Sequence, residues 1–573
     1  MNFSSLPTSV PAILAMTWKD HAPYFSDLET RILNESSMEA WLDDWSALAS
    51  CLDEQFTRLQ VMTSQHTADE GLQKQFDLFL DEVQPPAKTA DQKLKEKLLA
   101  SGLHPRGFEN ARRMMQTEAD IFHEENLPLQ AEEQKLSNEY ERIMGATTVI
   151  WEGEEKTFWQ MWMIFSYESE REVRERAWRL LEDRLFQNRD AMNELWGKFM
   201  ALRMKIASNA GFPDYRSYKW KQKFRFDYTP NDCKSFHRAI EEVAVPAALR
   251  VYERRTQRLK LDTTRPWDRS VDQFGRPALR PAETVAELNA RTLKVFEQVD
   301  PKFREYYQIM MENDLLDLDS RKDKASGAYS VGYNVANLPF IFMSHTNSIM
   351  DVETILHEGG HAFHTFEAAH LRFHQKAEIY SPAEFAEVAS MGMELLASPY
   401  LTRKRGGYFM DEESARALIS HIDAIILFLP YMALVDAFQH WIYENPAKAS
   451  DGVNCEEKWG ELWDRFIPGI DYSGFDNYKK AYWHRQGHIH TTPFYYVEYG
   501  LAQLGAVQVF GNARRNQEKA IADYRRALSL GSTAPLPELF STAGARFAFD
   551  TDTLKRVIDL LEEVIEEQET RLS

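Results

Sequence analysis

Apolar residues recur at three- and four-residue spacing along most of the chain. From about Leu28 to Ile143 they alternate with Glu, Lys, Gln and Arg, as in DQKLKEKLLASGL, and few Gly or Pro residues interrupt them. This period places apolar side chains on one face of a helix, so it predicts packed helical hairpins. The pattern continues from Trp159 to Asn209 and stops at Gly211 and Pro213.

A different pattern lies between Leu315 and Met350. The segments GAYSVGYNV and LPFIFMSH carry aromatic and β-branched residues in alternation, with turn residues between them. This predicts a small β-sheet, the only one we expect in the chain. The stretch Asp262 to Pro281 is rich in proline and predicts a long surface excursion rather than a linker between domains. The fold class is therefore mainly α.

Composition and charge narrow the class of protein. The 573 residues are 44% hydrophobic, enough for a large core, and 88 acidic against 67 basic residues give a net charge of -21. Such a charge repels phosphate backbones and anionic lipids, so we expect neither a nucleic-acid nor a membrane partner. Three scattered cysteines indicate no disulfide framework and suit the cytoplasm. The longest apolar run, Ala424 to Val435, is twelve residues, whereas a bilayer span needs about 20.

The stretch TILHEGGHAFHTFEA follows the predicted sheet and holds an HExxH motif. His357 and His361 are four residues apart, so on a helix their rings project from the same face and one tetrahedral Zn²⁺ bridges them. Glu358 lies between them as a candidate general base for a water that attacks a carbonyl. The alternative is a helix of buried histidines with no metal.

A zinc hydrolase site needs a third protein ligand. The segment SPAEFAEVASMGMELLASPYL begins with Ser381 and Pro382 as a helix start and places Glu384, Glu387 and Glu394 on one face. Carboxylates on an otherwise apolar helix are costly to bury unless a cation neutralises them. The alternative is an exposed acidic stripe.

Together these motifs resemble the oligoendopeptidase F and thimet oligopeptidase-like zinc peptidases. The resemblance lies in TILHEGGHAFHTF, FAEVASMGMELL, SRKDKASGAYS and GHIHTTPFYYVEYG, which span about Asp319 to Gly505. It implies a helical clamshell with a deep channel that admits short unfolded peptides. It also implies one Zn²⁺ per chain, with Glu387 as the third ligand and Glu394 supporting a zinc-binding histidine. Residues 1–160 would form a helical channel wall or lid, and residues 161–573 the catalytic domain.

The chain departs from the family pattern at two places. It carries Gly359 and Gly360 together, and each glycine costs about 1 kcal/mol in a helix interior relative to alanine. We expect Gly360 to let a neighbouring backbone approach the metal helix, whereas Gly359 is a local variant whose effect the sequence does not predict. His490 stands where relatives often have tyrosine, a change that could shift the pH profile or a subsite preference.

The late motif HIHTTPFYYVEYG supplies donors for the oxyanion that forms when an amide is attacked. It offers two histidines and three tyrosines near a turn. By the family pattern His488 and Tyr499 are the donors, with Tyr496 next. The alternative is an aromatic cluster that only packs a helix.

The sheet supplies a candidate substrate site. In peptidases of this architecture an extended peptide pairs with an edge strand, and Gly327 and Ala328 in ASGAYSVGY would allow close approach. The alternative is an internal hairpin without a ligand.

The sequence therefore predicts a zinc endopeptidase that cleaves short peptides at internal bonds. One alternative is a zinc carboxypeptidase or dipeptidyl-type exopeptidase, which needs a charged group for the free terminus; Arg485 and Arg321 are the candidates for a carboxylate. Another is a non-catalytic peptide-binding scaffold, against which the intact Glu358 argues, because a structural metal site has no use for a base.

Overall fold

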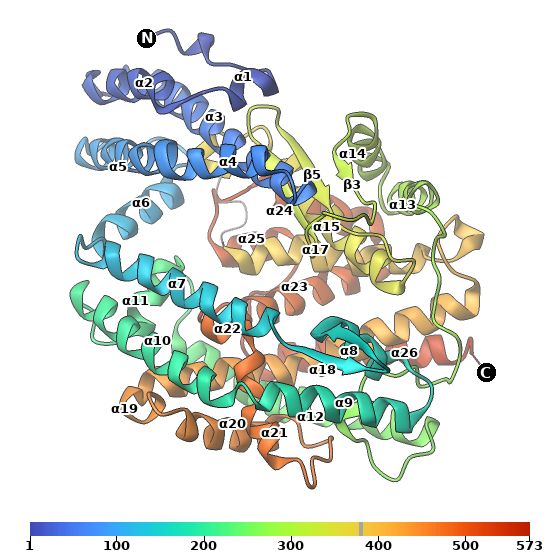
Figure 1. Cartoon of the computed structure of the whole chain (residues 1–573). Coiled ribbons are helices and arrows are strands. Elements are labelled where there is room, and N and C mark those ends of the chain that lie inside the picture. The colour runs from blue at the N-terminus through green and yellow to red at the C-terminus, as the bar shows by residue number, and fades with distance from the viewer. Residues whose placement is uncertain (377–381, 573) are drawn as a thin grey trace.

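The computed structural model describes residues 1–376 and 382–572, and α-helices dominate it (Figure 1). The expected mainly α fold is confirmed. Ser381, one of the two residues predicted to start a helix, lies outside the described residues, and the helix that follows has Pro382 at its N-cap.

The first helices enclose a hydrophobic cluster of their own. Trp41 and Trp45 are fully buried there between helices that come from the first 115 residues. Thr17 and Asp20 form a reciprocal cap at the start of the second helix. The helices of this region are α1 (Val10–Leu14), α2 (Trp18–Thr30), α3 (Met38–Gln65), α4 (Glu70–Leu78), α5 (Gln84–Ala100), α6 (Glu109–Ile121) and α7 (Asn126–Gly145).

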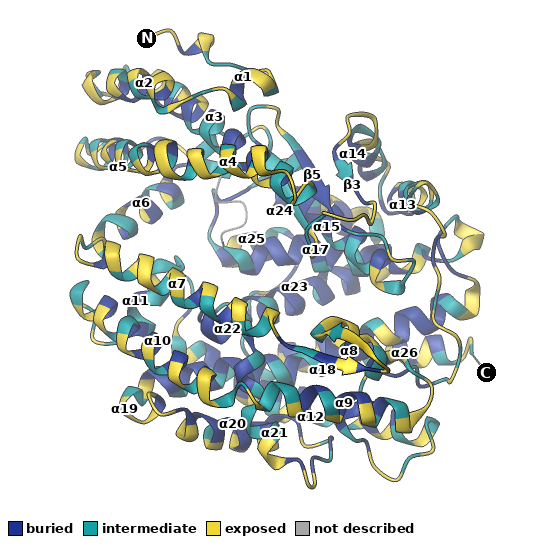
Figure 2. Cartoon of the chain, viewed as in Figure 1, coloured by how far each residue is buried: buried dark blue, intermediate teal, exposed yellow. Residues whose placement is uncertain are grey.

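A second, much larger cluster runs through the rest of the chain. Its most buried elements lie at the centre of the molecule, while the peripheral helices carry exposed residues on their outer faces (Figure 2). The helices before the predicted sheet are α8 (Phe158–Tyr167), α9 (Arg171–Phe186), α10 (Arg189–Asn209), α11 (Tyr215–Gln222), α12 (Pro230–Arg258), α13 (Val285–Val299) and α14 (Pro301–Glu312). Those after it are α15 (Ile349–Ala368), α16 (Phe373–Lys376), α17 (Ala383–Ala397), α18 (Asp411–Glu444), α19 (Pro446–Ala449), α20 (Gly452–Phe466), α21 (Asp476–Ala481), α22 (Gly487–His490), α23 (Tyr496–Arg515), α24 (Gln517–Ser529), α25 (Leu536–Thr542) and α26 (Thr551–Glu569).

The predicted sheet has three short strands and leads into α15. The strands β3 (Leu316–Asp317), β4 (Tyr329–Tyr333) and β5 (Leu338–Phe342) lie in the order β3–β5–β4, with β4 antiparallel to β5. Thus β4 is an edge strand, as expected. Ser348 and Asp351 cap α15 reciprocally, which fixes where the sheet segment ends and the metal helix begins.

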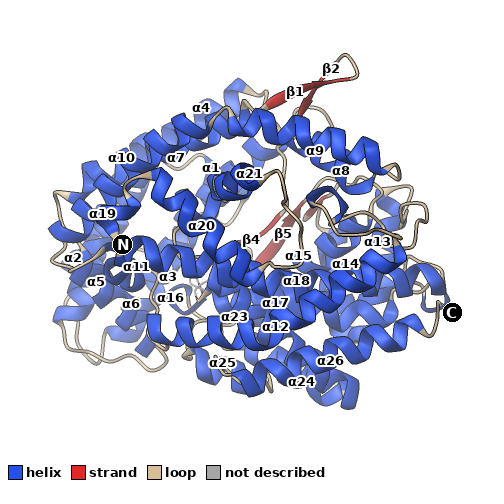
Figure 3. Cartoon of the chain, turned by 90° about the horizontal axis from the view of Figure 1, so that it is seen from below, coloured by secondary structure: helices blue, strands red, loops and turns tan. Residues whose placement is uncertain are grey.

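The prediction of a single sheet was wrong. A hairpin of β1 (Thr148–Trp151) and β2 (Glu154–Thr157) lies at the edge of the molecule (Figure 3). Its turn residues Glu152 and Gly153 both have positive φ, 53° and 87°, as a two-residue type I′ turn requires. The second strand is polar and exposed, so it carries no alternation by which the sequence could reveal it.

The stretch 262–281 is irregular apart from a short 3₁₀ turn, Pro266–Asp268, but it does not lie wholly on the surface as predicted, because this turn is buried. The buried Asp268 anchors it to α9 through Arg174, whose Nη2 lies 2.9 Å from the carboxylate.

Helix α18 is by length and composition apolar enough to cross a membrane. However, 67% of its most apolar stretch is buried in the protein, against α12, α20, α23 and α26. It is a central core helix, which explains why the apolar run from Ala424 continues beyond a single face.

Candidate active site

The metal helix α15 packs unusually closely against α17. A Cβ added at Gly360 would lie 2.4 Å from the carbonyl oxygen of Ala389 and 2.6 Å from Cα of Ser390. The expected approach of a neighbouring backbone at Gly360 is therefore confirmed. At Gly359 an added Cβ would lie 2.6 Å from Cζ of Phe296, so this glycine makes room for a ring from α13.

The two glycines should respond differently to alanine. At Gly360 the clash is with backbone that cannot give way, and the gain in helix propensity is only about 1 kcal/mol, so we expect the free energy of unfolding to fall by about 2 kcal/mol or more. Gly359→Ala meets the end of a ring and should stay within about 1 kcal/mol of the wild type. Urea unfolding of the two variants measures both effects. Equal effects would contradict this packing.

His357, His361 and Glu387 meet between α15 and α17. Their ligand atoms all lie within 4.8 Å of one another. Oε2 of Glu387 is 3.4 Å from Nε2 of His357 and 3.7 Å from Nε2 of His361. Two ligands of a tetrahedral zinc ion, at bond lengths of about 2.1 Å, lie about 3.4 Å apart. The donor set therefore fits Zn²⁺.

Neighbouring polar groups orient these ligands. Nδ1 of His357 donates to Oε1 of Glu394 at 2.6 Å, so Nε2 is the ring nitrogen that would hold a metal. Ser390, one turn after Glu387, donates its hydroxyl to Oε2 of Glu387 at 2.8 Å. Burial lowers the pKa of His357, but its bond to Glu387 and then the Glu394 contact outweigh burial and raise it well above the ordinary value.

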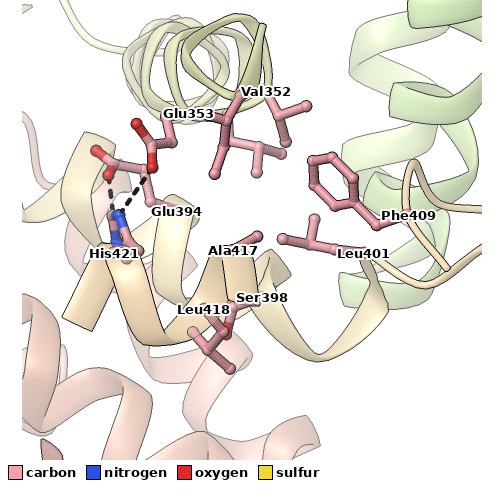
Figure 4. A pocket seen from close by; sticks show the side chains of 11 residues that line it. Val352, Glu353, Glu394, Ser398, Leu401, Phe409, Ala417, Leu418 and His421 are labelled. Atoms are coloured by element: carbon pink, nitrogen blue, oxygen red, sulfur yellow. Dashed lines mark ion pairs between the residues drawn. The ribbon is translucent and has the colours of Figure 1, made fainter. Parts of the chain in front are cut away.

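A histidine on α18, His421, contacts Glu394 in turn. Nε2 of His421 lies 3.5 Å from Oε2 of Glu394, and Nδ1 of His421 lies 3.6 Å from Oε1 of Glu353 on α15 (Figure 4). The three side chains gather at one end of an otherwise apolar pocket. The sequence analysis missed His421, because α18 carries no motif that connects it to HExxH.

Glu358 is buried beside the metal ligands. Burial raises the pKa of its carboxyl, the neighbouring His357 lowers it, and the net result is about 7. The backbone of Ser330 in β4 also lowers the pKa of this carboxyl, and α15 packs on β4, so the general-base candidate lies close to the edge strand. A carboxyl group whose pKa is close to 7, next to a metal site, is well suited to accept a proton from water.

Glu384, the alternative third ligand, is engaged elsewhere. Its Oε1 accepts a hydrogen bond of 2.5 Å from the hydroxyl of Tyr228 and lies 4.0 Å from Nε of Arg225. Glu384 and Glu387 are three residues apart on α17, yet only Glu387 meets the two histidines.

The late motif forms an aromatic wall next to this donor set. The ring of His488 lies 5.0 Å from that of Tyr496 and 6.1 Å from that of Tyr499. Burial and then the negative charge of Glu387 raise the pKa of Tyr499 to about 12, and Tyr495 also experiences the charge of Glu387. The ring of Tyr496 lies 5.9 Å from that of Tyr431 on α18. The wall nearest the metal ligands is thus Tyr495 and Tyr499, and the sequence analysis did not select Tyr495.

Hydrogen bonds fix the tautomer of His488. The hydroxyl of Tyr431 donates to Oε1 of Gln486 at 2.7 Å, so the amide nitrogen of Gln486 faces Nδ1 of His488, 3.0 Å away. Nδ1 therefore accepts, and the proton of the neutral ring is on Nε2. Burial and the nearby Lys223 lower the pKa of His488 and keep the ring neutral. A neutral imidazole of this kind is a hydrogen-bond donor at Nε2.

Comparison with known proteins agrees with the site. Residues 164–557 match Peptidase family M3, and residues 15–110 match the Peptidase M3 N-terminal domain. The chain belongs to peptidase family M3. Members of this family are zinc metallopeptidases, so the family resemblance predicted from the motifs is confirmed. The division at residue 160 stays a prediction.

Individual relatives are distant. The oligoendopeptidase F homolog of Mycoplasma genitalium is 23% identical over 299 residues, 48% of this chain and 46% of that protein. Oligopeptidase PepF of Bacillus subtilis is 25% identical over 283 residues, 48% of this chain and 40% of PepF. The chain thus matches these relatives over less than half of their length. A solved structure, Pz peptidase A with inhibitor 2, matches with a TM-score of 0.84 at 25% identity, over 99% of each chain.

His490, a departure from the M3 pattern in the late motif, is a packing residue here. It is fully buried, and its ring stacks on Tyr140 at 4.5 Å and on Trp483 at 5.4 Å. His364, the third histidine of the α15 cluster, is also buried and lies 6.3 Å from the ring of Phe385.

The remaining predicted residues of this M3 peptidase lie near the sheet, except Arg485, which is half-buried at the end of the 3₁₀ turn Tyr482–Arg485. Gly327 and Ala328 are exposed and directly precede β4, and within the described part of the chain no atom lies within 4 Å of a Cβ added at Gly327. Arg321 pairs with Asp317 at 2.6 Å, and Arg485 pairs with Glu182 at 2.7 Å. Both arginines considered for a substrate carboxylate therefore already have a carboxylate partner.

Proposed function

We propose that this M3 peptidase hydrolyses internal bonds of short, unfolded peptides with one Zn²⁺ held by His357, His361 and Glu387. The observation that carries the proposal is the convergence of these three side chains beside the buried Glu358. Their donor atoms already have the spacing of zinc ligands, and the base is the neighbour of one of them in sequence.

Each residue has a distinct role in the reaction. The metal, when bound, polarises the scissile carbonyl and lowers the pKa of a water. Glu358 takes a proton from that water and later delivers it to the leaving amine. Glu394 and Ser390 keep His357 and Glu387 in their orientations through the hydrogen bonds described above.

The oxyanion is stabilised by donors from the late motif. The hydroxyl of Tyr499 belongs to the part of the wall closest to Glu387, and the ring of His488 lies 6.1 Å from the ring of Tyr499, while Tyr496 lies beside Tyr431. Glu498 anchors this wall, because it pairs with Arg225 at 2.6 Å and with Lys223 at 2.8 Å at the start of α23. Donors held in place before the reaction cost no reorganisation when charge develops.

We expect Tyr499→Phe to lower kcat and kcat/KM by similar factors, roughly a hundredfold or about 2.7 kcal/mol, with KM and zinc content unchanged. A donor that meets the oxygen only as an oxyanion contributes to the transition state and little to substrate binding. Steady-state kinetics of Tyr499→Phe beside Tyr496→Phe and Tyr495→Phe measures this. A silent Tyr499→Phe beside a strongly impaired Tyr495→Phe or Tyr496→Phe would reassign the donor.

Endopeptidase action is favoured over exopeptidase action by the surroundings of the site. A peptide paired with β4 would pass Glu358, because α15 packs on β4 and the backbone of Ser330 in β4 lowers the pKa of that carboxyl. Arg321 and Arg485, the candidate clamps for a terminal carboxylate, are both paired. Gly327 and Ala328 lie just before this strand, where the incoming peptide would begin to pair.

We expect peptides of about ten residues, blocked at both ends, to be cut internally, and a folded protein to resist. Mass spectrometry of the products tests this, with the same peptides left unblocked as the control. Intact blocked peptides beside rapid trimming of free ends would favour a carboxypeptidase or dipeptidyl-type enzyme.

We place the protein in the cytoplasm, on the basis of its cysteine usage and acidic composition.

A further inference from the structure

Helices α12 and α18 bring four potential metal ligands together in the core, apart from the active site. Cys233 and His237 are four residues apart on α12, and Asp436 and His440 are four residues apart on α18. Each pair therefore projects from one face of its helix, and the two helices pack against each other. All four side chains are buried: Cys233 and Asp436 are 0% exposed, His440 2% and His237 4%.

The donor atoms of three of these side chains converge, and His237 lies beside one of them. The ligand atoms of Cys233, Asp436 and His440 all lie within 4.8 Å of one another. Oδ2 of Asp436 is 2.8 Å from Nε2 of His237 and 3.3 Å from Nε2 of His440. The second distance is close to the roughly 3.4 Å between two ligands of a tetrahedral zinc ion. The first has to widen by about 0.6 Å, and His237 has to turn toward Cys233 and His440, when an ion binds.

Hydrogen bonds do not satisfy all of the buried polar atoms in this cluster. Among the described residues, Oδ1 of Asp436 and Nε2 of His440 have no hydrogen-bond partner, although both atoms are shielded from solvent. The contact of 3.3 Å between Oδ2 of Asp436 and Nε2 of His440 therefore does not have the geometry of a hydrogen bond. Buried polar atoms without a partner are costly, and a cation would satisfy both.

We propose that Cys233, His237, Asp436 and His440 bind a second, structural Zn²⁺ that fastens α12 to α18. A thiolate, a carboxylate and two imidazoles form a closed four-ligand set, and sulfur beside nitrogen selects zinc over magnesium or calcium. The cysteine releases its proton to solvent on binding. One thiolate and one carboxylate then balance the two charges of the ion, so the buried site is neutral.

One contact has to change when the ion binds. Nη1 of Arg216 lies 3.2 Å from Nδ1 of His440 and 2.6 Å from Oε1 of Glu444. With Nε2 of His440 on the metal, the ring proton moves to Nδ1 and the guanidinium stays with Glu444 alone. The protein would hold two zinc ions, rather than the one that the sequence predicts.

Cobalt substitution tests this site without altering it. The active site offers no sulfur ligand, and the other cysteines, Cys51 and Cys455, are buried in separate places. A thiolate-to-cobalt charge-transfer band in the Co²⁺-loaded wild-type protein therefore reports Cys233. We expect the band in the wild type and in Cys51→Ser, and its loss in Cys233→Ser.

Zinc content gives an independent count. His357→Ala/His361→Ala removes two ligands of the active site, and after refolding with Zn²⁺ and dialysis it should retain one zinc per chain. Adding Cys233→Ser and His440→Ala to that background should reduce the content to none. A double variant without zinc, together with a wild-type cobalt spectrum that lacks the thiolate band, would overturn the second site. These readouts do not involve peptidase activity, so they stand or fall separately from the proposed function.

Discussion

Glu358→Gln is expected to lower kcat by roughly a hundredfold to ten-thousandfold while zinc stays bound. The amide keeps the size of the side chain but cannot accept a proton from water, and general-base catalysis contributes about that much. Steady-state kinetics combined with metal analysis measures both quantities. The rate loss should appear in kcat rather than in KM, because the substitution leaves the wall and the edge strand unchanged.

A matched control lies on the same helix. Glu367 contacts Arg525 at 2.7 Å on another face of α15, so Glu367→Gln should keep near-normal turnover. Near-normal turnover in Glu358→Gln would rule out the proposed base. Loss of zinc in Glu358→Gln would mean that this carboxylate is a ligand.

Glu387→Ala is expected to reduce the zinc content by close to one ion per chain and to abolish cleavage. The remaining two histidines cannot complete a stable site, and loss of a ligand weakens binding by more than the roughly 10–100-fold known for its outer partners. Metal analysis after dialysis measures the loss.

The control for this variant is Glu384→Gln on the same helix. Glu384 bonds to Tyr228 and lies outside the donor set, so its zinc content should match that of the wild type. Unchanged zinc in Glu387→Ala would move the third ligand to Glu384 or Glu394.

Local patterns in the sequence were sufficient to predict the main elements. The helical period and the alternating segment before HExxH both correspond to observed structure, because each reflects burial of one face. The β1–β2 hairpin was missed because β2 is polar and its turn rests only on Glu152 and Gly153. The two strands are too short for an alternation of apolar and polar residues to be recognised in the sequence.

The residues of the candidate site were likewise predicted only in part. HExxH spacing identified His357, Glu358 and His361, and the paired glycines correctly indicated a close backbone at Gly360. Contacts between distant segments could not be read from the sequence. The ring for which Gly359 makes room belongs to Phe296, 63 positions earlier in the chain, and the histidine that pairs with Glu394 is His421 on another helix.

The central claim is that one zinc ion lies between His357, His361 and Glu387. The most direct measurement is anomalous X-ray scattering from crystals of the zinc-loaded protein, recorded on both sides of the zinc absorption edge. The account predicts a zinc peak about 2.0–2.2 Å from Nε2 of both histidines and from the carboxylate of Glu387. No peak at that position, or a peak coordinated by Glu384 instead of Glu387, would contradict it.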